Sequence, residues 1–375
     1  MTLMITLCVI CAAIMLLLQY TAQHREHPDR ISGSEYRYSA GLVFLFFIVV
    51  AFISAHRYGF CDTGLYRDIC GNMGTDYNHA FDENLPIMDR GFNLLMIFSN
   101  NCGFEPQAII IFCSYVIFGV FLYAMYKYST DLPFSLFLLF FLSYYTMING
   151  IRQVLAAAIL LMAIPFLRDK KFFLYVPFVL LAYTMHASAI VMLPLYFILT
   201  RKRFNVGILV FYGVVSLFFV LPDLANRLLG GLLEDSTYYE YLNITETMGV
   251  MRLLVGAVPL VITALYHKAT AYDLVPDADS PDYKQHQMIA LLINMQFVSF
   301  GFTILGLRMV YFARISIFFE FVNALLLPVV IKKGFHPSSA RFIKHAAIVL
   351  YFAYFLYQTY TFYNYQYFHD FRLVF

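Results

Sequence analysis

Long apolar runs recur along almost the whole chain and constrain this sequence more than any other feature. A membrane-spanning helix needs about 20 mostly apolar residues, and ten runs approach or reach that length. They are 2–20, 39–56, 107–126, 132–149, 151–167, 205–221, 251–266, 287–306, 309–331 and 345–362. The runs predict a bundle of spanning helices.

The composition agrees with this interpretation. Hydrophobic residues make up 61% of the chain and charged residues 13%, whereas a water-soluble domain is about half apolar and about a quarter charged. The first twenty residues, "MTLMITLCVICAAIMLLLQY", lack the basic start and the small-residue cleavage site of a signal peptide. We therefore expect them to form the first spanning helix.

One further stretch, 172–199, is too long for a single crossing. It is interrupted around "TMHAS" and lies between two basic segments, 168–171 and 201–203. If both segments are cytoplasmic, the stretch must cross outward and return, as two short helices that meet near His186. The prediction is an all-α polytopic membrane protein, residues 1–375 forming one domain with about twelve spanning helices, some short or broken.

The lysines support this topology. Cytoplasmic loops of membrane proteins carry an excess of lysine and arginine. With the N-terminus placed outside, every lysine falls in the cytoplasm. These are Lys127, Lys170, Lys171, Lys202, Lys268, Lys284, Lys332, Lys333 and Lys344.

The basic side chains left on the outer side, apart from histidine, are all arginines. They are Arg57, Arg67, Arg90, Arg152, Arg227, Arg252, Arg308, Arg314 and Arg372. The planar guanidinium fork suits two-pronged binding of phosphate or carboxylate. Most of these arginines have loop acids nearby, but Arg152, Arg308 and Arg314 lie in or beside apolar runs. For these three, an anionic ligand and a structural partner both stay open.

Two long segments, 57–106 and 222–250, are predicted to face outward and to form a lid over the helices. Six cysteines match no metal-ligand spacing, so no metal site is predicted. A Cys61–Cys70 disulfide in the first segment is left open. The charged residues are distributed between the two sides of the membrane, so the net charge of +2 gives no indication of nucleic-acid binding.

Three polar residues in apolar surroundings are candidates for chemistry. Arg152 follows Asn149 and Gly150, and a helix break at the glycine would place the arginine in the first turn of a new helix, whose N–H groups favour anions. His186 lies at the predicted outer apex, where a structural role and a role in phosphate binding or proton transfer both remain open. Glu320 is the one acid deep in an apolar run, and its partner cannot be read from the sequence. No phosphate-binding glycine loop is present, which argues against a nucleotide-driven pump.

The stretches "IRQVLAAAI" (151–159) and "HASAIVMLPLYF" (186–197) resemble the EpsG family of bacterial polysaccharide polymerases, which are related in role to the Wzy polymerases. Further features are similar to that family. They are the Asp62-Thr63-Gly64-Leu65-Tyr66 element after Arg57, the segment Asp89-Arg90-Gly91-Phe92 with aspartate where the family has glutamate, and "LRMVYFAR" (307–314).

The resemblance implies a multi-pass protein of the bacterial cytoplasmic membrane whose active site faces the periplasm or the cell exterior. Its substrate would be an oligosaccharide unit on undecaprenyl diphosphate, for capsule, exopolysaccharide or O-antigen. It would be a metal-independent glycosyltransferase that needs no cofactor and moves the growing glycan onto the next lipid-linked unit. A membrane protein that regulates chain length is a partner that the resemblance leaves open.

On this hypothesis, arginine cations and placement of the two substrates supply most of the catalysis. Arg152, with Gln153 and Arg308 or Arg314, would bind the diphosphate, and His186 would support them. Asp62 would act as the base, while Arg57, Tyr66, Asp89 and Arg90 would shape the loop and contact the glycan. The alternatives are an O-antigen-ligase-like transferase, a glycosyltransferase that uses a lipid-phosphate sugar, and a flippase for the same lipid.

Overall fold

The computed structural model describes residues 2–29, 31–81, 90–233, 249–269, 282–364 and 373. Within these residues the chain is almost entirely helical. The longer helices are α1 (Thr2–Tyr20), α2 (Ala40–Ala55), α5 (Gln107–Tyr128), α6 (Leu132–Met147), α7 (Ile151–Met162), α9 (Phe172–Met185), α11 (Val206–Val220), α13 (Val250–Ala269), α14 (Tyr283–Gly306), α16 (Val322–Gly334) and α17 (Pro337–Asn364).

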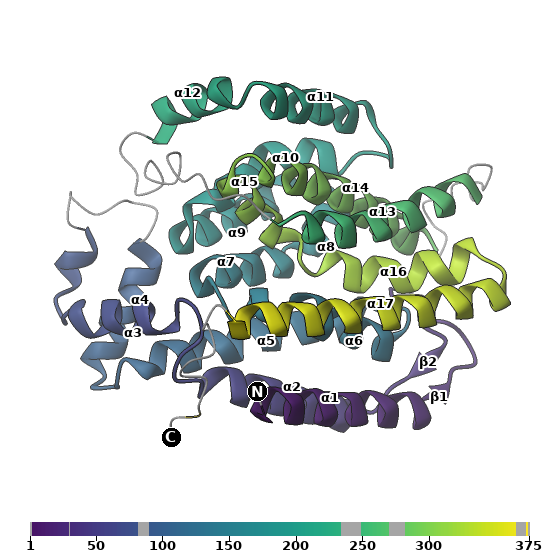
Figure 1. Cartoon of the computed structure of the whole chain (residues 1–375), viewed down its shortest axis with the longest axis horizontal. Coiled ribbons are helices and arrows are strands. Elements are labelled where there is room, and N and C mark those ends of the chain that lie inside the picture. The colour runs from purple at the N-terminus through teal and green to yellow at the C-terminus, as the bar shows by residue number, and fades with distance from the viewer. Residues whose placement is uncertain are drawn as a thin grey trace.

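Shorter elements connect these helices or lie at their ends. They are α3 (Thr63–Asn72), α4 (Arg90–Asn101), α8 (Ile164–Arg168), α10 (Met192–Leu199), α12 (Pro222–Leu233), α15 (Val310–Ile315), the 3₁₀ helices η1 (Tyr77–Phe81), η3 (Ala187–Val191) and η5 (Ser316–Phe319), and the strands β1 (Gln23–His24) and β2 (Tyr36–Arg37). Most long helices run side by side along the long axis of the molecule, with α3 and α4 at one end and the strand pair at the other (Figure 1).

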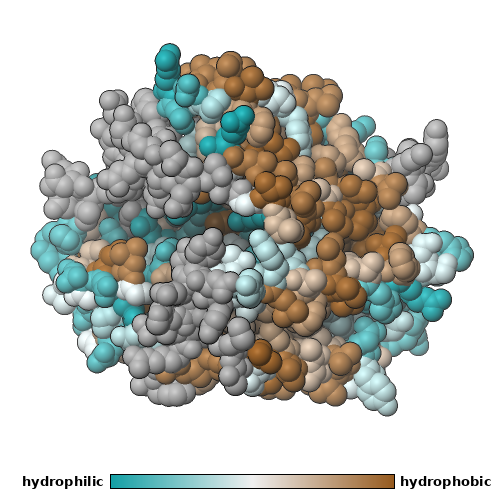
Figure 2. Space-filling view, viewed as in Figure 1, coloured by the Kyte–Doolittle hydropathy of each residue, from teal (hydrophilic) through white to brown (hydrophobic). Residues whose placement is uncertain are grey.

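Four helices are long and apolar enough to cross a membrane: α1, α5, α13 and α14. Two bent pairs qualify as broken spans, α11 with α12 at 106° and α15–η5 with α16 at 59°. Five shorter apolar helices accompany them, in the ranges Ala40–Ala55, Leu132–Met147, Ile151–Met162, Phe172–Met185 and Ala187–Leu199. An apolar band crosses the visible face, and hydrophilic residues gather toward both ends of the long axis (Figure 2). The protein is an all-α membrane protein.

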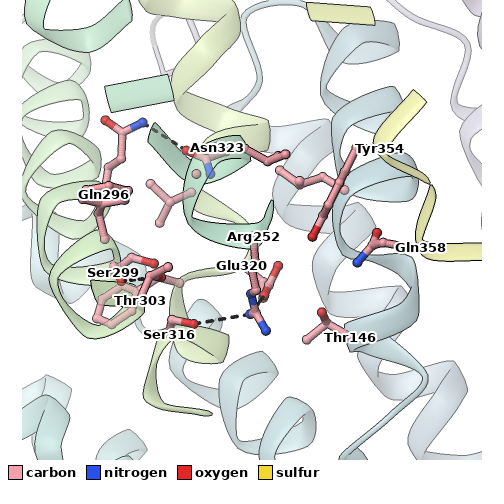
Figure 3. Close-up of a pocket in the computed structure, with 16 residues that line it drawn as sticks. Thr146, Arg252, Gln296, Ser299, Thr303, Ser316, Glu320, Asn323, Tyr354 and Gln358 are labelled. Atoms are coloured by element: carbon pink, nitrogen blue, oxygen red, sulfur yellow. Dashed lines mark hydrogen bonds and ion pairs between the residues drawn. The ribbon is translucent and has the colours of Figure 1, made fainter. Parts of the chain in front are cut away.

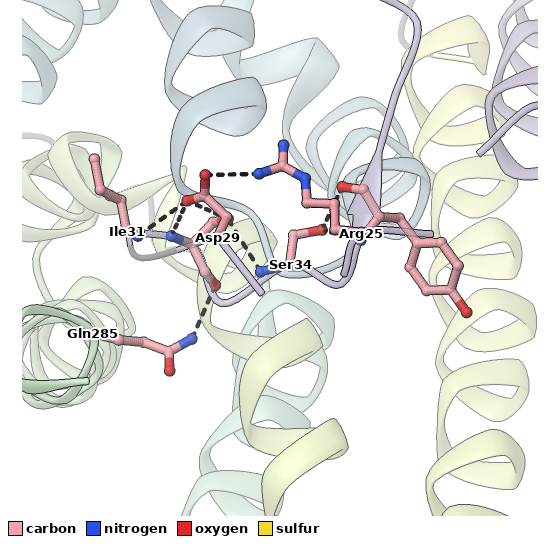
Figure 4. A network of polar contacts seen from close by, with 7 residues as sticks. Arg25, Asp29, Ile31, Ser34 and Gln285 are labelled. Atoms are coloured by element: carbon pink, nitrogen blue, oxygen red, sulfur yellow. Dashed lines mark hydrogen bonds and ion pairs between the residues drawn. The ribbon is translucent and has the colours of Figure 1, made fainter. Parts of the chain in front are cut away.

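The strand pair lies at an end of the bundle that carries Lys127, Lys332 and Lys333. Asp29 accepts hydrogen bonds from the backbone of Ile31 and Ser32 and from Arg25, which closes the loop between the strands (Figure 4). Gln285 of α14 donates to the Ser32 carbonyl at 3.0 Å. An ion pair of 2.9 Å joins Lys332 to Glu35. These contacts attach the loop to α14 and α16.

Two helix breaks fall where the sequence predicts them. Gly150 adopts a left-handed conformation with φ of +58°, a region that glycine enters without steric cost, and α7 begins at the next residue. The stretch 172–199 forms two short helical segments separated at His186, whose backbone is extended. All six cysteines are free, so the Cys61–Cys70 disulfide is not formed.

Candidate functional site

The break at Gly150 places Arg152 in the first turn of α7, at the end of the bundle opposite the strand pair (Figure 1). Its guanidinium lies 5.7 Å from the centre of the Phe92 ring of α4. Its Nε atom makes a long contact of 3.5 Å with the Met185 carbonyl at the end of α9. Arg152 is half-buried, and α4, α7 and α9 together fix its position.

His186 lies beside Arg152, because α9 ends at Met185 and the Met185 carbonyl contacts Arg152 in the first turn of α7. Its side chain is buried, and its Nδ1 atom hydrogen-bonds the Ser188 hydroxyl at 2.8 Å. The positive charges of Arg152 and Arg314 both act on the imidazole ring. Three segments far apart in sequence thus bring two guanidinium groups to one histidine.

Gln153 connects this group to α15. Its side-chain nitrogen donates to the Arg314 carbonyl at 2.7 Å and contacts the Ser188 hydroxyl at 3.4 Å. The residue is 3% exposed. The sequence suggested contact with a diphosphate, whereas the geometry gives Gln153 a bond that holds Arg314 in place.

Asp62 completes this group from the loop before α3. Burial raises the pKa of the Asp62 carboxyl, and the positive charge of Arg314 acts in the opposite direction. The carboxyl does not cap α3, since its side chain accepts no hydrogen bond from that helix. We refer to Arg152, His186, Arg314 and Asp62 as the arginine cluster.

Arg57 links the two loops that carry the cluster. It is 1% exposed, and its Nε atom donates to Thr63 Oγ1 at 3.0 Å. Its Nη2 atom donates to the Ile148 carbonyl at 2.9 Å, and Nη1 donates to Ser114 Oγ at 3.2 Å and to the Ser54 carbonyl. Thr63 follows Asp62, and Ile148 lies two residues before the break at Gly150. Arg57 therefore shapes the site from inside the protein, and its buried position leaves no face for a glycan.

Of the two other described loop residues predicted for the site, Tyr66 lies next to the cluster. Tyr66 packs edge-to-face against Phe92, 5.9 Å between ring centres, on the same ring that Arg152 approaches. Arg90, at the start of α4, has its guanidinium 5.7 Å from the centre of the Phe81 ring. Asp89 lies outside the described residues.

Arg308 is not brought to the cluster by any contact in the described part of the chain. It is exposed in the turn between α14 and α15, with its guanidinium 5.1 Å from the centre of the Phe219 ring of α11. Of the two alternatives that the sequence left open, Arg314 is the one whose charge acts on both His186 and Asp62.

A second polar site, of which the sequence indicated only Glu320, lies among α6, α13, α14, α16 and α17 (Figure 3). Arg252 and Glu320 form an ion pair of 3.0 Å, and the Ser143 hydroxyl donates to Glu320 at 2.9 Å. Gln296 donates to Asn323 at 3.0 Å across the same cavity, whose volume is about 90 Å³. We call this the Arg252–Glu320 pocket. An acid inside an apolar run signalled it, but the partner could be found only in three dimensions.

The 3₁₀ helix η5 separates the two sites. Phe318 faces the His186 ring, 6.4 Å between centres, whereas Ser316, Phe319 and Glu320 line the pocket. Figure 2 shows a hollow with hydrophilic residues on the visible face, near the helix ends at which the cluster lies. The arrangement defines a helical membrane protein with fixed cations at one end and, behind them, a polar pocket that contains one ion pair.

The EpsG family model matches residues 41–370, and the chain belongs to the EpsG family. Membership indicates a polysaccharide-polymerase-like, and so glycosyltransferase-like, role at a membrane with a lipid-linked substrate. Comparisons with curated proteins and with solved structures give no match.

Proposed function

We propose that this protein polymerises oligosaccharide units carried on undecaprenyl diphosphate at the outer face of the bacterial cytoplasmic membrane. The observation that carries the proposal is the arginine cluster. Arg152 contacts the Met185 carbonyl next to His186 at 3.5 Å, and Gln153 joins the Arg314 backbone to Ser188, the hydrogen-bond partner of His186. The charge of Arg314 also acts on the Asp62 carboxyl. Family membership supports the same reaction class.

The proposed reaction needs an anion site more than a strong nucleophile. A hydroxyl of the acceptor unit forms a bond to the anomeric carbon of the growing glycan while the bond from that carbon to the diphosphate oxygen breaks. The hydroxyl proton passes to Asp62, and the electron pair leaves with the diphosphate. Fixed donors placed where negative charge develops stabilise such a step, which is the role we assign to Arg152 and Arg314.

His186 and Asp62 would divide the remaining tasks. The buried His186 would donate a hydrogen bond to the diphosphate from beside the two guanidinium groups. Asp62 would accept the proton, as a base must lie within hydrogen-bond reach of the group it deprotonates. Arg57 would hold the loop that carries Asp62 in a fixed position relative to the turn at Gly150, without contacting the substrate.

We count twelve crossings in this helix order. The four long helices, α11, the bent pair of α15–η5 with α16, and the five short apolar helices make eleven segments. The twelfth is α17, which is 28 residues long but is not among the helices apolar enough to qualify as spans. With the N-terminus outside, this order would place the cluster outward and the strand pair in the cytoplasm. Segments 57–106 and 222–250 would then form the lid, of which residues 82–89 and 234–248 lie outside the described residues.

The purified full-length protein in lipid nanodiscs, given its lipid-linked repeat unit, tests the proposal. A ladder of glycan lengths is expected. Arg152→Lys keeps the charge but loses the two-pronged fork, and we expect at least a tenfold loss of polymer at unchanged protein level. Arg67→Lys, in the same outer region, is the matched control and should retain the ladder.

Other products would refute the proposal. Addition of a single sugar would indicate a transferase, and transfer to a lipid A core would indicate a ligase. Movement of the lipid without new glycosidic bonds would indicate a flippase. A wild-type ladder from Arg152→Lys would leave polymerisation standing but would remove Arg152 from the diphosphate site.

A further inference from the structure

The Arg252–Glu320 pocket is rich in hydrogen-bonding groups but carries no net charge. Carboxamides, hydroxyls and one ion pair from five helices share a cavity of about 90 Å³ inside an apolar bundle. Polar groups in such a place are costly unless they are paired or functional. Because Arg252 and Glu320 neutralise each other at 3.0 Å, the pocket is better suited to an uncharged polar ligand than to an ion.

Gln296 of α14 lines the pocket with a side chain that is only partly hydrogen-bonded within the described residues. Gln296 is 4% exposed; its nitrogen donates to Asn323, but its carbonyl oxygen has no hydrogen-bond partner among the described residues. Leaving such a buried acceptor unpaired costs about 1–3 kcal/mol. This oxygen is enclosed and points away from Arg252 and Glu320 (Figure 3). Gln296 therefore reaches a ligand through its side-chain nitrogen and through the Asn323 amide that it holds in place.

The pattern of donors and acceptors fits a sugar. Each sugar hydroxyl can both donate and accept, and the carboxamides of Gln296 and Asn323 offer both functions side by side. Tyr354 and Phe319 contribute aromatic surface to the same cavity. The volume holds several waters, which corresponds to the hydroxyl edge of one sugar ring and not to a whole oligosaccharide.

The pocket also lies next to the arginine cluster, close enough for one lipid-linked saccharide to contact both. Arg314 belongs to the cluster, Ser316 lines the pocket, and only one residue separates them in the chain. The His186 ring faces Phe318 from the other side of η5. A lipid-linked saccharide has a charged diphosphate and neutral sugars, and these two sites offer matching chemistry on the two sides of one helical turn.

We infer that the Arg252–Glu320 pocket is a saccharide subsite that binds one neutral sugar of a lipid-linked unit. This inference rests on the proposed function and adds a second contact for the same substrate class. Glu320 and Asn323 accept hydrogen bonds from sugar hydroxyls, and Gln296 holds the Asn323 amide in position. Arg252 holds Glu320 in position and donates to a neighbouring hydroxyl.

The test separates the two sites by using two probes on the full-length protein in nanodiscs. One probe is the phosphate-free repeat-unit oligosaccharide, released by partial hydrolysis of the polysaccharide from the cells that carry this protein. The other is inorganic pyrophosphate. Gln296→Leu should weaken oligosaccharide binding at least tenfold and change pyrophosphate binding less than twofold, whereas Arg152→Gln should show the reverse.

Asn294→Leu is the matched control. Asn294 is a buried amide of the same helix, but it donates to the carbonyls of Leu199 and Arg201, away from the pocket. We expect it to lower stability and to keep oligosaccharide affinity in the folded fraction. Wild-type oligosaccharide affinity in Gln296→Leu, no binding by the unmodified protein, or an equal loss in Asn294→Leu would overturn the inference. The ladder assay reports on the proposed function independently of these results.

Discussion

Replacing Arg57 by lysine tests whether a buried guanidinium holds the site together. Arg57 uses three nitrogen atoms to reach acceptors on two loops, Thr63 Oγ1 at 3.0 Å and the Ile148 carbonyl at 2.9 Å among them. A lysine has one nitrogen, which cannot occupy the separate positions of Nε and Nη2. At least two hydrogen bonds from a charged donor are therefore lost.

The size of the effect follows from that count. A hydrogen bond to a charged group contributes about 1.5–3 kcal/mol, so two of them give a loss of about 3–6 kcal/mol in the free energy of unfolding. Because about 1.4 kcal/mol corresponds to a factor of ten, even the lower figure changes the folded-to-unfolded ratio more than a hundredfold. Equilibrium unfolding in mixed micelles measures this difference.

The kinetic consequence separates positioning from substrate contact. Arg57 is too buried to touch a glycan, so Arg57→Lys should lower kcat in the ladder assay and leave KM for the lipid-linked unit within about twofold, since only interactions that differ between ground and transition states change kcat. Arg67→Lys is the control, because Arg67 lies half-buried over the Tyr58 ring. An unfolding free energy unchanged in Arg57→Lys, or lowered equally in Arg67→Lys, would refute the reasoning.

Three further predictions concern other parts of the site. Burial raises the pKa of Asp62 above its usual 3.8, so base-dependent activity should fall on acidification at a higher pH than for an exposed aspartate. The folded protein favours protonated Asp62, so the free energy of unfolding falls as pH rises from 3.8 through the raised pKa. Asp62→Asn should therefore be more stable than the wild type at neutral pH. Thermal unfolding of Asp62→Asn should also lack the pH dependence that Asp62 causes in this range. A Cβ added at Gly306 would lie 2.6 Å from the Cβ and 3.1 Å from the Cα of Ala313 in α15. Gly306→Ala should therefore lower the free energy of unfolding by about 1–3 kcal/mol. Gly213→Ala is the control and should not destabilise the protein, because no atom lies within 4 Å of the added Cβ. Glu320→Gln leaves Arg252 without its ionised partner; since Arg252 is 35% exposed, we expect a loss of about 1–3 kcal/mol, below the full cost of a buried pair. A double-mutant cycle with Arg252→Gln should show coupling, and additive losses would count against the ion pair.

The helical breaks were predictable because their causes are local. A glycine that can adopt a positive φ precedes α7, and short apolar runs bounded by basic segments signalled the turn at His186. The residues alone predicted an outer position for Arg152 and for His186, and the family resemblance supplied the hypothesis that they act together. No local pattern, by contrast, shows which way a side chain faces, so Gln153 and Arg57 were expected at the substrate and lie inside the protein.

The Glu320 partner shows the same limit. Arg252 is 68 residues away in the chain, and it meets Glu320 because α13 packs against α16. Likewise, Arg314 and not Arg308 lies near His186 because of the direction that α15 takes after the turn that follows α14. Such contacts depend on the packing of distant helices, which single-sequence periodicity does not encode.

By itself, the sequence determined that this chain is a helical membrane protein, since apolar run length and composition decide whether a segment is more stable in lipid or in water. It also determined where two helices break and which residue types carry charge among them. Only the tertiary structure decided which of those charges meet. Inside the bundle a polar side chain must find its partner on a neighbouring helix, and the identity of that neighbour is set by packing across the whole molecule.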